Sequence, residues 1–119
     1  STLSFADLAA QVSQWQQAFK ASGIQKGDRV AGFIPNMPQA VIAMLAASSM
    51  GAIWSSASPD FGTQGVVDRF GQIEPKILVT VDGYYYNGKT VDCLERIAQI
   101  QPLLPGLQKT IIIPFTGHS

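Results

Sequence analysis

The sequence predicts an α/β fold, a three-layer sandwich in which helices cover both faces of a mainly parallel sheet of about four strands. Helical and extended segments alternate along the chain, and the extended segments are continuously apolar, as in strands buried on both faces. Parallel strands that are joined through helices take right-handed crossovers. We therefore expect a single α/β domain over residues 1–114, a small tyrosine-rich hairpin within it, and a frayed tail over 115–119.

The first helix is expected over residues 5–21. Ser4 and Asp7 resemble the start of a capping box, in which side chains satisfy free backbone N–H groups. Gly23 suits the end of this helix, because glycine tolerates the left-handed conformation. Apolar side chains recur on one face at helical spacing, and they are Leu8, Val12, Trp15 and Phe19.

The remaining elements follow the same alternation. We expect strands over 30–34, 52–55, 77–81 and 110–113, and helices over 39–50, 63–72 and about 92–100. The helix over 39–50 is apolar nearly all round, which predicts that it is buried. The side chains expected to point inward from the last two helices are Val66, Val67, Phe70 and Ile73, and Leu94, Ile97 and Ala98.

Composition excludes several kinds of partner. Eight basic residues balance eight acidic ones without a basic stripe, so no nucleic-acid partner is expected. No apolar run reaches about 18 residues, so we expect no membrane span. The one cysteine, Cys93, is expected to be a buried thiol, and such a chain fits a reducing, cytoplasmic compartment.

The share of charged residues is low for a small domain surrounded by water. Charged residues make up 13% of the chain and apolar residues 46%. We therefore expect part of the surface to face another domain. Alone, such apolar surface would favour a homodimer.

Ligands of open parallel sheets bind beyond the carboxyl ends of the strands. In this chain those ends lead into residues 35–37, 56–60 and 82–89. The second and third of these segments follow successive strands along the chain. They are therefore expected to meet at the edge of the sheet.

The third segment is a tyrosine-rich hairpin with two interpretations. Asn87 and Gly88 suit a type I′ turn, so Tyr84 and Tyr86 would point to one side and Tyr85 to the other. In the structural interpretation the tyrosines cover the sheet edge, and the charge of Lys89 is solvated. In the functional one a tyrosine packs on a base or ribose while Lys89 meets a phosphate. The residue pattern alone favours the structural interpretation.

Other catalytic patterns are missing from the sequence. It contains neither the phosphate-binding loop of P-loop enzymes nor the glycine fingerprint of dinucleotide-binding folds. No Cys or His cluster has metal-ligand spacing, and the single histidine, His118, lies in the expected tail. Asp28 and Arg29 are expected to end a turn, and Arg69 is a surface charge that could reach the sheet edge. We predict no catalytic residue and no metal ligand.

Two long stretches resemble a known family. "GDRVAGFIPNMPQAVIAMLAASSMGAIWSSASPDFG" and "VDRFGQIEPKILVTVDGYYYNGK" are similar to the acyl-CoA synthetases of the adenylate-forming superfamily, and the likeness covers about residues 3–114. Within the family, "IWSSASPDFG" and "VDGYYYNGKT" differ from the acetate-using enzymes. The resemblance implies ligation of acetoacetate, or a similar short acid, to coenzyme A (CoA) with ATP and Mg. It also implies that the adenylation motifs lie downstream, so this chain alone should be inactive and hold no cofactor tightly. Its partner would be the remainder of the synthetase.

The resemblance also implies which residues touch CoA. In the acetate-using relatives the nucleotide end of CoA lies on two loops, which here correspond to Ser58, Pro59 and Asp60, with Phe61 beside them, and to Tyr86 and Lys89. The relatives carry arginines at the last two positions, facing the 3′-phosphate, and a glycine in place of Asp60. Lysine keeps the charge but loses the two-pronged geometry. A carboxylate at position 60 is unfavourable near a phosphate unless it turns away.

One alternative of a different class remains open. The chain would then be a standalone flavodoxin-like module that binds a nucleotide or serves as a scaffold without catalysis. The missing phosphate-binding glycine turn counts against FMN or a dinucleotide as its ligand.

Overall fold

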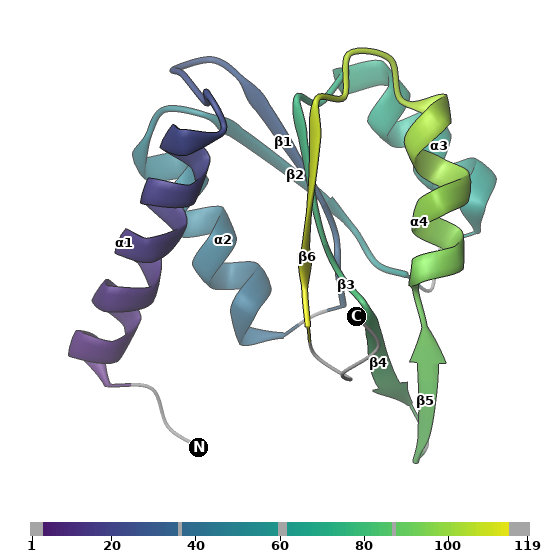
Figure 1. Ribbon diagram of the computed structural model, residues 1–119, viewed down its shortest axis with the longest axis horizontal. Coiled ribbons are helices and arrows are strands. Elements are labelled where there is room, and N and C mark those ends of the chain that lie inside the picture. Colours follow the sequence, from purple (N-terminus) through teal and green to yellow (C-terminus); the bar gives the residue numbers. More distant parts are fainter. Residues whose placement is uncertain (1–3, 36, 60–61, 87, 115–119) are drawn as a thin grey trace.

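Parallel strands form the central layer of the protein (Figure 1). The computed structural model describes the chain except for residues 1–3, 36, 60–61, 87 and 115–119. Within the described residues the sheet has four strands in the order β2-β1-β3-β6, every neighbouring pair being parallel. The strands are β1 (Arg29–Phe33), β2 (Ile53–Ala57), β3 (Ile77–Val81) and β6 (Lys109–Ile113).

Helices cover both faces of this sheet, which confirms the predicted three-layer α/β architecture. Figure 1 shows α1 (Phe5–Ala21) and α2 (Pro38–Ser49) on one side of the sheet. The opposite side carries α3 (Thr63–Ile73) and α4 (Leu94–Ile100). A short 3-10 helix, Gln101–Leu103, extends α4 where the sequence predicted only a loop.

Each face of the sheet has its own apolar core. Strand side chains alternate between faces, so Ile77 and Val79 of β3 join the core under α1 and α2, whereas Leu78 joins the core under α3 and α4. All five residues of β3 are buried, because this strand has a neighbour on each side and helices on both faces. The edge strands β2 and β6 are only partly buried.

The first helix matches its prediction at both ends. The Ser4 hydroxyl accepts a hydrogen bond from the Asp7 N–H at 3.1 Å, which is the cap that the sequence indicated. Gly23 follows the helix with a φ of +85°, the left-handed conformation that glycine permits. Phe19 is fully buried against the small side chains of α2.

Two predictions about inward faces were wrong. The second helix is not buried all round, because Val41, Met44 and Leu45 are 45%, 36% and 40% exposed. Its buried side consists of Ile42 and small alanines, which let α1 and the sheet approach closely, and no described element covers the other side. In α4 it is Ile100, three residues after Ile97, that points inward, while Ala98 is exposed.

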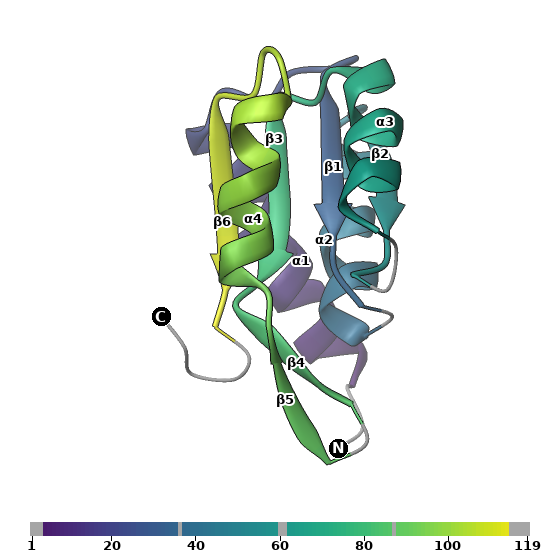
Figure 2. The same ribbon diagram turned by 90° about the vertical axis from the view of Figure 1, so that its right-hand side faces the viewer.

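The tyrosine hairpin is confirmed as an antiparallel pair outside the main sheet. It consists of β4 (Gly83–Tyr86) and β5 (Lys89–Asp92), and Tyr86 pairs with Lys89 next to the turn. Gly88 has a φ of +75°, as expected for its place in the turn, while Asn87 lies outside the described residues. Figure 2 shows the hairpin extending past the carboxyl ends of the strands.

Three further expectations concern a membrane span, metal ligands and the tail of the chain. No helix in the described part of the chain is both long and apolar enough to cross a membrane. Groups of three or more His, Cys, Asp or Glu side chains that could hold a metal ion are absent from the same residues. The expected tail over 115–119, with His118, lies outside the described residues.

Candidate functional site

The sheet order changes how the predicted loops meet. The chain passes from β2 to β3 through α3, and β1 lies between these two strands in the sheet. The loop after β2 and the hairpin after β3 therefore do not follow neighbouring strands of the sheet. Their order along the chain had suggested that they would. Figures 1 and 2 show both at the carboxyl end of the sheet, with the hairpin reaching farther out.

An arginine of α4, the helix after the hairpin, binds the loop after β2. Arg96 donates a hydrogen bond from Nη1 to the carbonyl oxygen of Pro59, and its guanidinium lies 4.9 Å from the centre of the Phe33 ring. The helix that follows the hairpin thus holds the loop that follows β2. We did not identify Arg96 from the sequence; the available signal was a charged residue between the apolar positions Leu94 and Ile97 of a short helix.

The end of β3 anchors the base of the hairpin. Thr80 is fully buried, and its hydroxyl donates to the carbonyl oxygen of Phe33 at 2.6 Å. The backbone N–H of Asp82 donates to Ile113 at 3.2 Å, and the Asp82 carbonyl accepts from the N–H of Cys93 at 2.9 Å. These bonds tie β3 to β1, β6 and the end of the hairpin, so the carboxyl edge is held from several sides.

The loop after β2 lies beside a hollow at this edge. Pro59 is buried and Ser58 is half-buried, while Asp60 and Phe61 lie outside the described residues. The hollow has a volume of about 330 Å³. It is lined by Ile34, Pro35, Ala40, Ser56, Ala57, Ser58 and Arg69. Arg69, a surface charge that the sequence allowed to reach the sheet edge, is thus among the residues at this edge.

The hairpin residues differ in their surroundings. Tyr84 is half-buried and packs against the core under α3 and α4, whereas Tyr85 is 59% exposed. Lys89 is exposed at the start of β5, opposite Tyr86 in the strand register. The side chain of Tyr86 is outside what the structure describes. The structural interpretation therefore holds for Tyr84, and the ammonium group of Lys89 is open to solvent.

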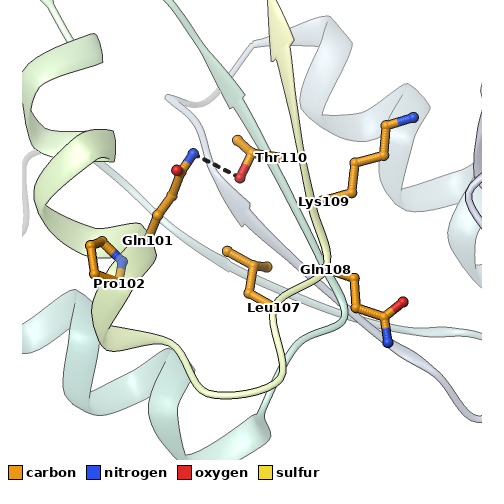
Figure 3. Close-up of a pocket in the computed structure, with 6 residues that line it drawn as sticks. All are labelled: Gln101, Pro102, Leu107, Gln108, Lys109 and Thr110. Carbon is orange, nitrogen blue, oxygen red and sulfur yellow. Dashed lines mark hydrogen bonds between the residues drawn. The ribbon is translucent and has the colours of Figure 1, made fainter.

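A larger hollow lies elsewhere, beside the edge strand β6 (Figure 3). Its volume is about 410 Å³, and Gln101, Pro102, Leu107, Gln108, Lys109 and Thr110 line it. Gln101 donates from Nε2 to the hydroxyl of Thr110 at 2.9 Å, so these two polar groups pair with each other. The hollow sits at the amino end of β6, opposite to the edge where parallel sheets bind ligands.

Two shifted pKa values belong to structural groups. Burial raises the pKa of the Cys93 thiol to about 11, although Arg96 nearby acts in the opposite direction. A hydrogen bond from the Gln25 N–H, and then the bond and charge of Lys76, lower the pKa of Asp28. Asp28 accepts from Gln25 at 2.8 Å and pairs with Lys76 at 3.2 Å. It stabilises a turn, as predicted, at the amino end of β1.

The sheet with its carboxyl-edge loops agrees with the family to which the chain belongs. The family of AMP-binding enzymes matches residues 1–118, so this chain is a member of that family. Among individual relatives, the acetoacetyl-coenzyme A synthetase of Rhizobium meliloti is 51% identical over 117 residues, which are 98% of this chain and 18% of that protein. The acetoacetyl-CoA synthetase of Macaca fascicularis is 48% identical over 97% of this chain and 17% of its own length.

A solved structure gives the same result. The acetoacetyl-CoA synthetase from Streptomyces lividans superposes with a TM-score of 0.95 and 44% identity, and the match covers 100% of this chain and 18% of that one. The resemblance found in the sequence is thus confirmed, as is the fold. The chain spans less than a fifth of the length of these relatives.

Proposed function

We propose that this chain forms part of an acid–CoA ligase and supplies part of the seat for the nucleotide end of CoA. The observation that carries the proposal is the loop after β2, which Arg96 holds at the carboxyl edge of the sheet beside an open hollow. The names of the similar synthetases support acetoacetate, or a similar short acid, as the acid. They likewise support the remainder of a synthetase as the partner of this chain. The cytoplasmic location predicted from the single cysteine stays a prediction.

The proposed ligation of the acid to CoA proceeds in two steps. A carboxylate oxygen of the acid attacks the α-phosphate of ATP, which gives an acyl-adenylate and releases pyrophosphate. The thiol of CoA then attacks the acyl carbon, loses its proton and displaces AMP, which leaves the thioester. In this proposal the remainder of the synthetase binds ATP with its magnesium ion.

The residues of this chain have binding roles in the second step. Ser58 and Pro59, with Asp60 beyond them, would line the seat of the nucleotide. The exposed ammonium of Lys89 would act as a point charge toward a phosphate, and Tyr86 would offer a ring and a hydroxyl. Because Lys89 is solvated, its contact is worth little by itself. The chain alone is therefore expected to bind CoA weakly and to catalyse nothing.

The test uses a chimeric synthetase. The aligned segment of the Rhizobium meliloti enzyme is replaced with this chain, to which it is 51% identical. Lys89→Glu in the chimera should raise the KM for CoA about three- to tenfold, because one exposed charge contact becomes repulsive. Acid-dependent exchange of pyrophosphate into ATP, which needs no CoA, should stay unchanged. An unaltered KM for CoA would remove Lys89 from the site.

A second candidate is favoured by the strand order. The order β2-β1-β3 is also the start of a flavodoxin-like sheet, which binds a nucleotide without further domains. Calorimetric titration of the isolated chain with CoA, AMP and FMN distinguishes the two proposals. Tight binding of any of them would favour the standalone module, whereas the ligase proposal expects weak binding or none.

A further inference from the structure

Arg69 differs from the other arginines of this chain. Arg29 donates to the carbonyl oxygen of Ile73 and Arg96 to that of Pro59, so both are engaged with the backbone. Arg69, the remaining arginine of the sequence, forms no hydrogen bond or ion pair with any other described residue. The adjacent Asp68 accepts from Gln64 at 2.8 Å. A guanidinium without a partner among the described residues is therefore presented at the carboxyl edge.

The surroundings of Arg69 form a concave site. The residue is exposed on α3 but lines the same hollow as Ser58, where the ends of β1 and β2 meet the start of α2. Ile34 and Ala57 are 4% exposed and give the hollow an apolar floor. Ser56 and Ser58 add hydroxyl groups to its lining. No acidic side chain is among the lining residues in the described part of the chain.

This combination suits a phosphate. A guanidinium presents several N–H donors in one plane, which matches the oxygens of a phosphate in a two-pronged contact, and it carries no acceptor. A hollow of about 330 Å³ is at the small end of ligand pockets, so it accommodates one part of a large cofactor. The apolar floor can contact the carbon atoms next to such a group.

We propose that Arg69 binds a phosphate of CoA, and that the hollow beside Ser58 receives this part of the cofactor. This inference rests on the proposed function, and it adds a cation that is separate from Lys89 on the hairpin. CoA carries a 3′-phosphate and a pyrophosphate at different places along its length, so two separate cations can serve one molecule of it. The pyrophosphate and the 3′-phosphate offer Arg69 the same chemistry, and the test distinguishes them.

The experiment compares thiol substrates in the chimeric synthetase with and without Arg69→Gln. With CoA the variant should raise the KM about tenfold, since hydrogen bonds to charged groups are strong, and leave pyrophosphate exchange unchanged. With pantetheine, which has no phosphate, the two proteins should have the same KM. Dephospho-CoA lacks only the 3′-phosphate. If Arg69→Gln still raises the KM for dephospho-CoA, Arg69 binds the pyrophosphate. If the KM for dephospho-CoA is the same in both proteins, Arg69 binds the 3′-phosphate.

Control variants separate charge from geometry. Arg69→Lys keeps the charge and should recover part of the affinity for CoA, while Asp68→Asn changes the charge of the adjacent exposed residue and should leave the KM for CoA unchanged. An unaltered KM for CoA in Arg69→Gln, an equal rise with pantetheine, or a rise only for ATP or the acid would overturn the inference. A folded chimera that ligates no acid to CoA would instead overturn the proposed function, and this inference with it.

Discussion

At the scale of single residues, Arg96 contributes to stability through its contacts with Pro59 and Phe33. Its guanidinium donates to the carbonyl oxygen of Pro59 and stacks over the ring of Phe33. Arg96→Ala should lower the free energy of unfolding by about 1–3 kcal/mol, because a charged hydrogen bond and a cation–π contact are lost together. Urea unfolding followed by circular dichroism measures the change.

The matched control lies on the same helix. Gln99→Ala removes an exposed side chain of α4 and should change the stability by less than about 0.5 kcal/mol. Equal effects of the two substitutions would show that the contacts of Arg96 contribute nothing beyond an ordinary helix position.

Cys93 gives a prediction about pH at the same scale. The thiol is 1% exposed, and its burial raises its pKa from 9.0 to about 11. The folded chain therefore holds the thiol proton more tightly than the unfolded chain does. The resulting stabilisation is complete below pH 9 and is lost as the pH rises through about 11.

Thiol modification at pH 8 tests this directly. The higher pKa corresponds to a roughly hundredfold smaller thiolate fraction in the folded chain, and the burial of the sulfur slows the reaction further. A thiol-reactive dye should therefore modify the native protein far more slowly than the urea-unfolded protein. Comparable rates in the two states would contradict a buried, neutral Cys93.

At the scale of elements, the pairing of β1 with β2 depends on a glycine. Gly32 lies opposite Ser56 in the register, and a Cβ added at Gly32 would come within 2.5 Å of the Trp54 ring. Gly32→Ala should destabilise the protein by about 1–3 kcal/mol, because a large indole has to move in a packed region. The same substitution at Gly71, inside α3, meets nothing within 4 Å.

This second glycine provides a control of opposite sign. Alanine favours a helix over glycine by roughly 1 kcal/mol, so Gly71→Ala should raise the melting temperature while Gly32→Ala lowers it. Thermal unfolding of both variants decides the matter. A neutral Gly32→Ala would mean that Trp54 is loosely packed.

The elements also show which information the sequence contains. Both ends of helix α1 were predicted correctly, because a cap at Ser4 and a glycine at position 23 are local signals. The exposed side of α2 was not predicted, since a helix that is apolar all round has no pattern to say which side faces the core. The position of β1 between β2 and β3 depends on contacts between distant segments, and so does the role of Arg96. The sequence indicates where the loops lie along the chain, but it does not indicate which elements they contact.

At the scale of the whole molecule, an apolar stripe on α2 remains uncovered by any described element. Val41, Met44 and Leu45 lie on one side of this helix, at positions i, i+3 and i+4, and each is at least 36% exposed. The similar synthetases are more than five times as long as this chain, so in such a protein further chain is available to cover the stripe. Alone, the stripe is free to meet a second copy, since exposed apolar patches favour association.

We therefore predict that the isolated chain forms dimers through α2. Light scattering at micromolar concentration should give a mass well above the 12.7 kDa of one chain. Leu45→Glu, which places a charge within the stripe, should return the mass to that of a monomer. Leu103→Glu is the matched control, because Leu103 is 56% exposed on the 3-10 helix after α4, on the opposite face of the sheet. A monomeric unmodified chain, or a dimer that Leu45→Glu leaves intact, would show that the stripe does not mediate association.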